Sequence, residues 1–533
     1  MGKDKQPVDE YEEKDLRTHI YDTTDTYAGS DQLIKTNLAI FRENEKNITI
    51  TETEYIPVIY KMFDEIIVNS RDQRERLKGV TGAVHLTEIK VDIDKETGII
   101  SIYNNGDGIR IEKHSSGLYN PNLIFGRLLT SGNYKKDEKR TVGGKNGYGA
   151  KIVNIFSDSF DVETGDRFTK QKYFQHFYEN MKKVDEPVIK KYTGKPYTRV
   201  TWKTDFKRFG ITGFSDDMVA LMKRRVYDIA GVTDNKVTVS YNGKKINVNS
   251  FQDYIELYPS AIKTYEHLSE RWEVGICVSP NDKFEQLSFV NGISTPNGGI
   301  HVDTVTKMIS SLVVKYIKKK HKKDVQEKYV KNYLSVYLNC IIENPSFDSQ
   351  AKERLITPKS KFGSQPDITE KLIKKVCDTG LSEKVMQFSD FKENTLAKKT
   401  NGVKKNKLRD IPKLDDANWA GGRKSDQCTL ILTEGDSAKS MAIAGLSIVG
   451  RDKYGVFPLK GKVLNVRDAN IKQIVGNAEI TNIKKIIGLE SGKKYKDTKT
   501  LRYGKVMIMT DQDHDGSHIK GLVLNLFHSL WPE

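Results

Sequence analysis

The sequence has few of the features that mark membrane or disulfide-rich secreted proteins. No apolar run approaches the roughly 20 residues that a membrane span requires. The opening stretch MGKDKQPVDEYEEKD is too polar for a secretory signal. Cysteine occurs only four times in 533 residues, without the spacing of a metal site: Cys277, Cys340, Cys377 and Cys428. We therefore expect buried thiols, a reducing compartment and no membrane partner.

The sequence also lacks the usual phosphate-binding loop, because GxxxxGK[ST] does not occur in it. Acidic residues are outnumbered by basic ones, and the formal net charge is +16. Such a charge favours a polyanionic partner, most often nucleic acid; a basic surface that binds nothing is the alternative. The 37% hydrophobic and 30% charged residues are typical of a globular protein. The length predicts about three or four domains.

The stretch GGKNGYGAK, residues 143–151, packs four glycines and two lysines into nine residues. Apolar residues at helical spacing follow it. Glycines let a backbone approach a ligand closely, and a loop that opens a helix presents free N–H groups to it. A phosphate chain suits such a loop. A flexible turn without a ligand is the alternative, and this stretch alone does not decide between them.

The stretch YKMFDEIIVNSRDQ, residues 60–73, has the apolar spacing of a helix. Glu65, Asn69 and Asp72 lie on one stripe of that helix, at i, i+4 and i+7. A glutamate beside a phosphate loop can accept a proton from an attacking water. An asparagine can offer an oxygen to Mg²⁺. A solvated polar face is the alternative for this stripe.

A strand pair is predicted next, with Ile89, Val91 and Ile93 alternating with polar residues before a turn and a second strand at 99–103. The second strand ends in NNGDGI, residues 104–109, where two glycines permit close approach of a flat group. Asn104 is placed to contact an adenine edge. The later stretch LLTSGNY adds Ser131 and Asn133 as hydroxyl and amide donors.

Glu65 and Asn69, then NNGDG, then GGKNGYGAK, in that order, closely resemble the GHKL ATPase module, in detail that of eukaryotic-type type IIA DNA topoisomerases. The resemblance implies Glu65 as the general base for ATP hydrolysis, Asn69 as a Mg²⁺ ligand and Asn104 as the adenine contact. The wider superfamily has Asp where this chain has Asn104, but the topoisomerase II branch shares the Asn. Other implied nucleotide contacts are Ser131, Gly132, Asn133, Gly144, Lys145, Asn146, Gly147, Tyr148, Gly149, Ala150 and Lys151. Tyr27, an exposed aromatic in a predicted turn at 24–31, matches the N-terminal strap that reaches the dimer partner.

The middle of the chain predicts a hairpin at 237–248 around Asn242-Gly243. Apolar residues between 305 and 317 then repeat at helical spacing, and the predicted helix ends in a dense lysine cluster. A solvated helix end accounts for one or two lysines beside the helix dipole. Contact with a DNA phosphate backbone accounts better for Lys318, Lys319, Lys320, Lys322 and Lys323.

The stretch ENPSFDSQAKERL, residues 343–355, resembles the transducer loop of the same family. In that loop a Gln and a Lys reach the neighbouring domain and contact the γ-phosphate. The resemblance implies that Gln350 positions the nucleotide and that Lys352 stabilises charge developing in hydrolysis. Because the contact requires the γ-phosphate, it would link nucleotide state to domain geometry.

Two acidic strand ends follow in the last third of the chain. TLILTEGDSAKSMAIAGL, from residue 429, predicts a strand ending at Glu434 and then a helix. KVMIMTDQDHDGSH, from residue 505, predicts a buried strand ending at Asp511, Asp513 and Asp515. A calcium EF-hand is excluded because its twelfth position, normally Glu, is Leu522. The four carboxylates instead predict a Mg²⁺ site, since close like charges require a cation.

EGDSA followed 77 residues later by DQDHDG strongly resembles the TOPRIM domain of type IIA topoisomerases. The resemblance implies Glu434 as metal ligand and acid/base in DNA strand cleavage and rejoining. Asp511, Asp513 and Asp515 would hold one or two Mg²⁺ ions. Lys460 and Lys462 would meet DNA near the cut. The family's cleaving tyrosine lies on a winged-helix domain farther along, and no tyrosine here matches its motif.

The sequence therefore predicts a multidomain α+β and α/β protein. The expected parts are an arm (1–26), a GHKL ATPase sandwich (27–240), a transducer with a ribosomal-protein-like β-α fold (241–400), a basic linker (401–427) and an incomplete α/β TOPRIM domain (428–533). The expected function is the ATP-hydrolysing gate of a type IIA topoisomerase, without DNA cleavage on its own, in a piece of a longer enzyme. Expected partners are duplex DNA and a second copy of the chain, in the nucleus or a viral DNA compartment. The alternative is a mismatch-repair or chaperone-type GHKL clamp.

Overall fold

The computed structural model describes residues 12–130, 139–144, 147–259, 262–402, 404, 408 and 410–533. The chain divides into two compact units, Met1–Val385 and Met386–Glu533, and each is described by itself. In the part of the chain that is described, no helix is both long and apolar enough to cross a membrane. The prediction of buried thiols is confirmed, because all four cysteines are buried and none forms a disulfide.

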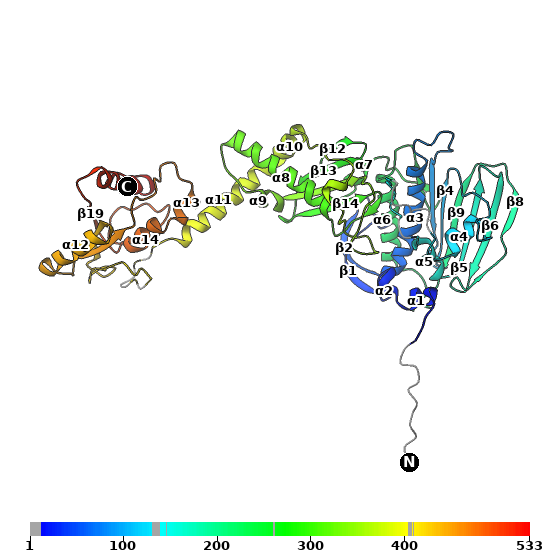
Figure 1. Cartoon of the computed structure of the whole chain (residues 1–533), viewed down its shortest axis with the longest axis horizontal. Helices are drawn as coiled ribbons and strands as arrows, with labels where there is room; N and C mark the ends of the chain where they lie inside the picture. The colour runs from blue at the N-terminus through cyan, green and yellow to red at the C-terminus, as the bar shows by residue number, and fades with distance from the viewer. Residues whose placement is uncertain are drawn as a thin grey trace, which may run out of the picture. The chain divides into compact units, whose positions relative to one another are not determined.

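Among the described residues, a nine-stranded sheet forms the centre of the first part of unit 1 (Figure 1). Its order is β11-β10-β3-β4-β9-β5-β6-β7, and β8 also pairs with β6. Strand β10 runs parallel to β3, whereas the other pairs are antiparallel. The strands are β3 (Glu88–Ile93), β4 (Ile99–Asn105), β5 (Ser157–Asp166), β6 (Gln171–Tyr178), β7 (Lys183–Val184), β8 (Val188–Lys191), β9 (Tyr197–Thr204), β10 (Thr238–Tyr241) and β11 (Lys244–Lys245).

Helices α3 (Pro57–Leu77), α5 (Gly149–Ile155) and α6 (Asp216–Gly231) pack together and against this sheet. The apolar stripe predicted for residues 60–73 explains why, since Met62, Phe63 and Ile67 are fully buried in the shared core. The predicted strand pair and the Asn242-Gly243 hairpin are also confirmed. The remaining elements of this part are α1 (Leu16–Asp22), α2 (Thr24–Tyr27), the antiparallel pair β1 (Ile34–Ile40) and β2 (Thr49–Tyr55), α4 (Asn120–Gly126) and α7 (Phe251–Glu256).

A second sheet, five-stranded in the described residues, has the order β12-β13-β16-β14-β15. Helix α8 (Ile300–His321) buries Val305, Ile309, Val313 and Ile317 completely, one residue per turn, which confirms the helix predicted there. The strands are β12 (Thr264–Ser269), β13 (Trp272–Val278), β14 (Glu285–Val290), β15 (Ile293–Ser294) and β16 (Leu334–Cys340). The other helices are α9 (Glu327–Asn332), α10 (Glu370–Val376) and α11 (Ser382–Lys399), the last of which spans the division between the units.

Unit 2 is built on three parallel strands within its described residues, in the order β18-β17-β19. These are β17 (Thr429–Glu434), β18 (Tyr454–Leu459) and β19 (Lys505–Met509), accompanied by helices α12 (Gly435–Val449), α13 (Ile471–Gly476), α14 (Ala478–Ile487) and α15 (His514–Leu530). The prediction of a buried strand before the aspartates is wrong. Strand β19 lies at the edge of the sheet, and Met507 is 45% exposed.

The described parts of two polar stretches contain structure that the sequence did not predict. The expected arm contains α1, whose Ile20 is fully buried in the core of unit 1. In the expected linker, Ile411, Ala417 and Ala420 pack into the core of unit 2. Asp416 pairs there with the buried Arg502. A few apolar side chains anchor each stretch, and their spacing carries no periodic signal.

Candidate active site

A cavity of about 1100 Å³ lies in unit 1, between α3, the end of β4, the start of α5 and a loop that follows the second sheet. Residues predicted from widely separated motifs line it together. They are Glu65, Asn69, Asn104, Gly144, Gly147, Tyr148, Gly149, Ala150, Lys151, Gln350 and Lys352. Five further predicted contacts, Ser131, Gly132, Asn133, Lys145 and Asn146, lie outside the described residues.

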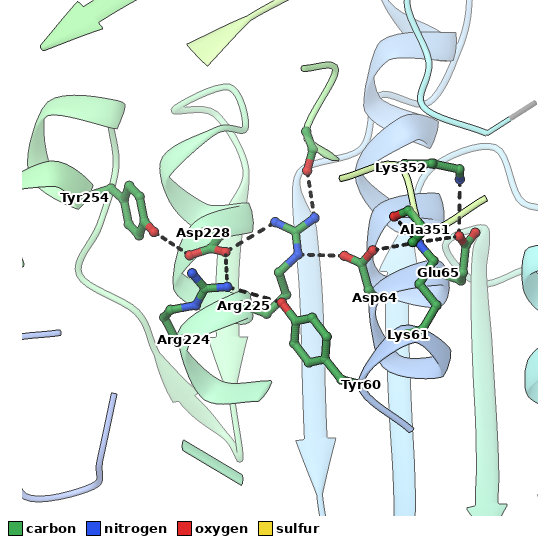
Figure 2. A network of polar contacts seen from close by, with 11 residues as sticks. Tyr60, Lys61, Asp64, Glu65, Arg224, Arg225, Asp228, Tyr254, Ala351 and Lys352 are labelled. Carbon is green, nitrogen blue, oxygen red and sulfur yellow. Dashed lines mark hydrogen bonds and ion pairs between the residues drawn. The ribbon is translucent and has the colours of Figure 1, made fainter. Parts of the chain in front are cut away.

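Glu65 stands on α3 with only 6% of its surface exposed, and two lysines meet its carboxylate. Lys352 Nζ lies 3.2 Å from Glu65 Oε1, and Lys61 Nζ lies 2.8 Å from the same oxygen (Figure 2). Burial alone would raise the pKa of Glu65, but the charges of Lys352 and Lys61 outweigh it and lower that pKa. Glu65 is therefore ionised at neutral pH, as a general base must be before it accepts a proton.

Gly149 opens α5 directly against the Glu65 carboxylate. A Cβ built on Gly149 would lie 2.1 Å from Glu65 Oε2, far inside van der Waals contact. The fourth glycine of the motif therefore has a specific packing reason. It lets the start of α5 approach the carboxylate on the cavity wall.

Asp72, the third residue of the polar stripe on α3, holds the start of the glycine-rich stretch. Its carboxylate accepts hydrogen bonds from the backbone N–H groups of Gly143, at 3.0 Å, and Gly144, at 3.1 Å. Burial raises the pKa of Asp72, while Arg76 and Arg71 oppose that change. The three residues of the polar stripe on α3 therefore have different surroundings: Glu65 and Asn69 line the cavity, and Asp72 binds the backbone of the glycine-rich stretch.

Lys151 is a buried cation on α5, 3% exposed, and its side chain lines the cavity. Its ammonium donates to the carbonyl of Thr130 at 2.8 Å. Within the described ranges no carboxylate pairs with it. Burial lowers the pKa of Lys151 to about 8. An anion entering the cavity would stabilise this charge, so the site suits phosphate oxygens.

Lys352 and Gln350 reach the cavity on a loop beyond the second sheet. The backbone N–H of Lys352 donates to the carbonyl of Ser349 at 3.2 Å, and Lys352 adopts a left-handed conformation with φ of 63°. For a residue with a Cβ, this conformation costs roughly 1–3 kcal/mol and is found mainly where function requires it. The turn directs a lysine 287 residues away in sequence onto Glu65.

Asn69 and Asn104 lie at two other walls of the cavity. Asn69 is half-buried one helical turn beyond Glu65, so its amide oxygen suits a cation that also bridges phosphates. Asn104, at the end of β4, is 7% exposed, and its Nδ2 donates to the carbonyl of Asn105 at 3.0 Å. An amide oxygen accepts hydrogen bonds, so Asn104 suits a donor on a base edge.

Tyr27 differs from its prediction, because it is half-buried rather than exposed and ends a short helix rather than lying in a turn. Its ring lies 5.8 Å from that of Tyr148 in the glycine-rich stretch of the same chain. Its hydroxyl lies 3.1 Å from His19 Nδ1. In this structure Tyr27 therefore packs beside its own chain's cavity.

The lysine cluster at the end of α8 is largely exposed. Lys318 lies 2.9 Å from Asp324 and Lys320 lies 3.4 Å from Asp378, so both are paired with carboxylates. Lys322 ends the helix in a left-handed conformation. The exposed members are Lys318, Lys319, Lys320 and Lys322, and Lys323 is half-buried.

The acidic residues of unit 2 do not assemble as a metal site in this structure. Among the described residues no group of three or more His, Cys, Asp or Glu side chains is close enough to hold a metal ion. Glu434 accepts a hydrogen bond from the backbone of Asp511 at 3.3 Å, and Asp513 caps α15 through Gly516 N–H at 2.7 Å. Asp515 pairs with Lys462 at 3.0 Å, and Lys460 is exposed. The carboxylates are neighbours, but they do not converge.

Three family descriptions match the chain in consecutive ranges. Residues 55–176 match "Histidine kinase-, DNA gyrase B-, and HSP90-like ATPase", residues 239–405 match "DNA gyrase B" and residues 429–532 match "Toprim domain". The crystal structure of the ATPase region of Saccharomyces cerevisiae topoisomerase II is 39% identical, with a TM-score of 0.67, and is covered completely by 72% of this chain. The chain belongs to the type IIA DNA topoisomerase family.

Other topoisomerases are similar to this chain as well. The ATPase and transducer domains of the Balamuthia mandrillaris enzyme are 34% identical with a TM-score of 0.69, covering 73% of this chain and 100% of that one. DNA topoisomerase 2 of Drosophila melanogaster is 47% identical, and human DNA topoisomerase 2-beta 48%, each over 98% of this chain. The match covers 37% and 32% of those two proteins, so the chain spans about a third of their length. The ATPase clamp without DNA cleavage does not account for the Toprim match.

The structure also brings residues to the topoisomerase cavity that the sequence motifs did not indicate. Arg140 lines the cavity just before the glycine-rich stretch, and its carbonyl accepts from Asn344 N–H at 2.8 Å. Thr198 reaches the cavity from β9. A basic residue beside a phosphate loop was a usable signal for Arg140. Thr198 had none, because only the pairing of β9 with β4 places it there.

Proposed function

We propose that the chain binds ATP with Mg²⁺ in this cavity and hydrolyses it, as the gate of a type IIA topoisomerase that passes one DNA duplex through a transient break in another. The observation that carries the proposal is the meeting of Glu65 with Lys352. A buried, ionised carboxylate on the ATPase side contacts a lysine that arrives from beyond the second sheet. The three matched ranges support an ATPase domain, a transducer and a TOPRIM domain in that order.

The residues of the cavity divide the work of hydrolysis. Glu65 takes a proton from the attacking water, which its lowered pKa allows at neutral pH. Lys151 and the glycine-rich stretch hold the phosphates, and Asn104 contacts the adenine. Asn69 would hold the Mg²⁺ that accompanies the triphosphate, and the ion would neutralise charge on the phosphate oxygens.

Lys352 links hydrolysis to the second sheet. In this structure its ammonium pairs with Glu65 at 3.2 Å. The same group would move onto the γ-phosphate, with Gln350 beside it, and stabilise the charge that develops there. Loss of the γ-phosphate would then release the loop. Nucleotide state would be transmitted to the part of the chain that carries the loop.

DNA and a second copy of the chain are the proposed partners. The exposed lysines at the end of α8, with Lys460 and Lys462 in unit 2, would contact phosphates without reading sequence. The nucleus, or another compartment where the genome is handled, is the proposed location. No DNA cleavage step is proposed for the carboxylates of unit 2, which do not converge among the described residues.

The direct test measures ATP hydrolysis by the 533-residue chain with and without duplex DNA, alongside Glu65→Gln. The variant keeps the size of the side chain but removes the base, so turnover should fall by at least about 100-fold. Binding of a non-hydrolysable ATP analogue should survive. Glu273→Gln, half-buried in the second sheet beside Tyr265, is the matched control and should keep full turnover. Normal turnover in Glu65→Gln would exclude Glu65 as the base.

Dimer formation is tested by sedimentation of the same chain. A non-hydrolysable ATP analogue should convert monomer to dimer, because the proposed gate closes only while the γ-phosphate is present. ADP at saturating concentration is the control and should leave the monomer. A chain that stays monomeric with bound analogue would contradict the gate.

A further inference from the structure

Lys61 occupies a buried position behind the cavity wall, one helical turn before Glu65. Its ammonium reaches three oxygens, Glu65 Oε1 at 2.8 Å, Asp64 Oδ2 at 3.2 Å and the carbonyl of Ala351 at 3.4 Å (Figure 2). An ammonium has three N–H donors, so these contacts use all of them. Lys61 is 7% exposed and lies outside the described lining of the cavity. It therefore acts on a bound nucleotide only through its neighbours.

Asp64, which binds the Lys61 ammonium through one oxygen, is bound by an arginine through its other oxygen. Arg225 on α6 is fully buried, and its Nε lies 2.7 Å from Asp64 Oδ1. The other end of the same guanidinium donates to the carbonyl of Gly292, between β14 and β15, at 2.8 Å. Lys61 is thus held against a carboxylate that Arg225 binds on its other oxygen, and Figure 2 shows these side chains in a row.

Glu65 Oε1 is shared by two cations that differ in their freedom to leave. Lys352 is on a loop, and the proposed hydrolysis moves it to the γ-phosphate. Lys61 is on the same helix as Glu65, at the i, i+4 spacing that keeps side chains in contact. A buried carboxylate left without a cation takes up a proton and loses its use as a base.

We propose that Lys61 is a positioning residue that keeps Glu65 ionised and aimed into the cavity while Lys352 moves to the phosphates. Its bond to the carbonyl of Ala351 adds a second task. The residue before Lys352 is bound to the cation that holds the base, so docking of the loop and orientation of Glu65 depend on one ammonium. This inference rests on the proposed ATP hydrolysis and adds a residue to its machinery.

The charged groups around Glu65 fix the sign of the expected pH effect. From α3 it faces Lys61 and Asp64, and from the loop it faces Lys352. Arg225 of α6 reaches Asp64 rather than Glu65, and α5 contributes the backbone of Gly149. Removing Lys61 removes a positive charge beside Glu65, so its pKa rises. The acidic limb of the kcat profile should then move to higher pH, by about 1–3 pH units.

The test compares kcat–pH profiles of the full 533-residue chain with those of Lys61→Met, Lys61→Gln and Lys61→Arg. The Met and Gln variants should move the acidic limb to higher pH by about one pH unit or more. Lys61→Arg keeps the positive charge, so its acidic limb should lie close to that of the unaltered chain. The affinity for a non-hydrolysable ATP analogue should change less than about threefold, because Lys61 does not touch the cavity. Lys223→Met is the matched control. Lys223 is equally buried, at 7% exposure, and binds the Arg42 carbonyl and Glu43 away from the cavity.

Each outcome decides the proposal. An acidic limb that stays in place in the Met and Gln variants, or moves as far in Lys223→Met, overturns it. Loss of analogue binding in both the Met and Gln variants would make Lys61 a structural residue, which also overturns it. Absence of ATP hydrolysis in the unaltered chain would instead reject the proposed function, so the two failures are distinguishable.

Discussion

ATP affinity should fall as pH rises through about 8, because Lys151 loses its charge there. The ammonium of Lys151 is buried, and its described partner is the neutral carbonyl of Thr130 at 2.8 Å. Burial lowers its pKa to about 8 from an ordinary 10.5. Bound phosphates favour the charged form, so the pKa of Lys151 rises when the nucleotide binds. Between these two pKa values, binding takes up a proton.

The size of the effect follows from this shift. Below about pH 7 the lysine is charged in both states, and affinity does not depend on its titration. Above the free-state pKa, the dissociation constant should rise about tenfold for each pH unit. At about pH 9 the loss is therefore roughly tenfold, or about 1.4 kcal/mol. Replacing Lys151 by Met should weaken binding at neutral pH and abolish the slope.

The assay is titration of the chain with a non-hydrolysable ATP analogue from about pH 7.5 to 9.5, repeated in two buffers that differ in ionisation enthalpy to count the proton taken up. Lys484→Met is the matched control, because burial also lowers the pKa of Lys484 to about 8 but its ammonium binds Thr400 and Ser491 in unit 2. That variant should keep the slope. A flat profile in the unaltered chain, or an equal slope in Lys151→Met, would refute the reasoning.

Two further predictions concern packing and charge. Gly149→Ala should displace the Glu65 carboxylate, since its Cβ would lie 2.1 Å from Oε2, and a misplacement of about 1 Å costs on the order of 100-fold in kcat. Gly445→Ala in α12, where a Cβ meets nothing within 4 Å, is the control, and equal turnover in both would remove the packing reason for Gly149. Changing Lys318, Lys319 and Lys322 together to Gln should reduce DNA-stimulated hydrolysis more than basal hydrolysis and weaken its salt dependence. The control changes Lys90, Lys203 and Lys244 to Gln, which removes the same charge from the nine-stranded sheet. If this control weakens the stimulation of hydrolysis by DNA equally, the cluster at the end of α8 is an ordinary solvated helix end.

Local patterns were sufficient for most of the secondary structure. Apolar spacing predicted α3 and α8, because a helix buries one stripe of side chains and the sequence must supply it. Alternation predicted the β3–β4 pair. Asn242-Gly243 predicted the β10–β11 hairpin, because both residues adopt the positive φ that the turn requires. The motifs also predicted which side chains gather at the cavity, since their order matched a family in which they do.

Local patterns failed where a few long-range contacts decide the structure. Tyr27 and Ile20 pack against distant parts of unit 1, and Asp416 is held by Arg502 in unit 2. The spacing of the aspartates around Asp513 predicted a Mg²⁺ site, and that site stays a prediction: in this structure Asp513 caps α15 and Asp515 pairs with Lys462. Neighbouring carboxylates in sequence share a site only if the backbone turns them inward, which no spacing specifies.

The sequence by itself determined most of the elements, the family and a set of side chains that line one cavity, because these depend on residue types and on intervals of a few positions. Only the tertiary structure decided how their charges are balanced. Lys352 meets Glu65 across 287 residues, and Lys61 binds both that carboxylate and the carbonyl of Ala351, the residue before Lys352. Charge balance in a buried site depends on distance and desolvation, which exist only after the chain has folded.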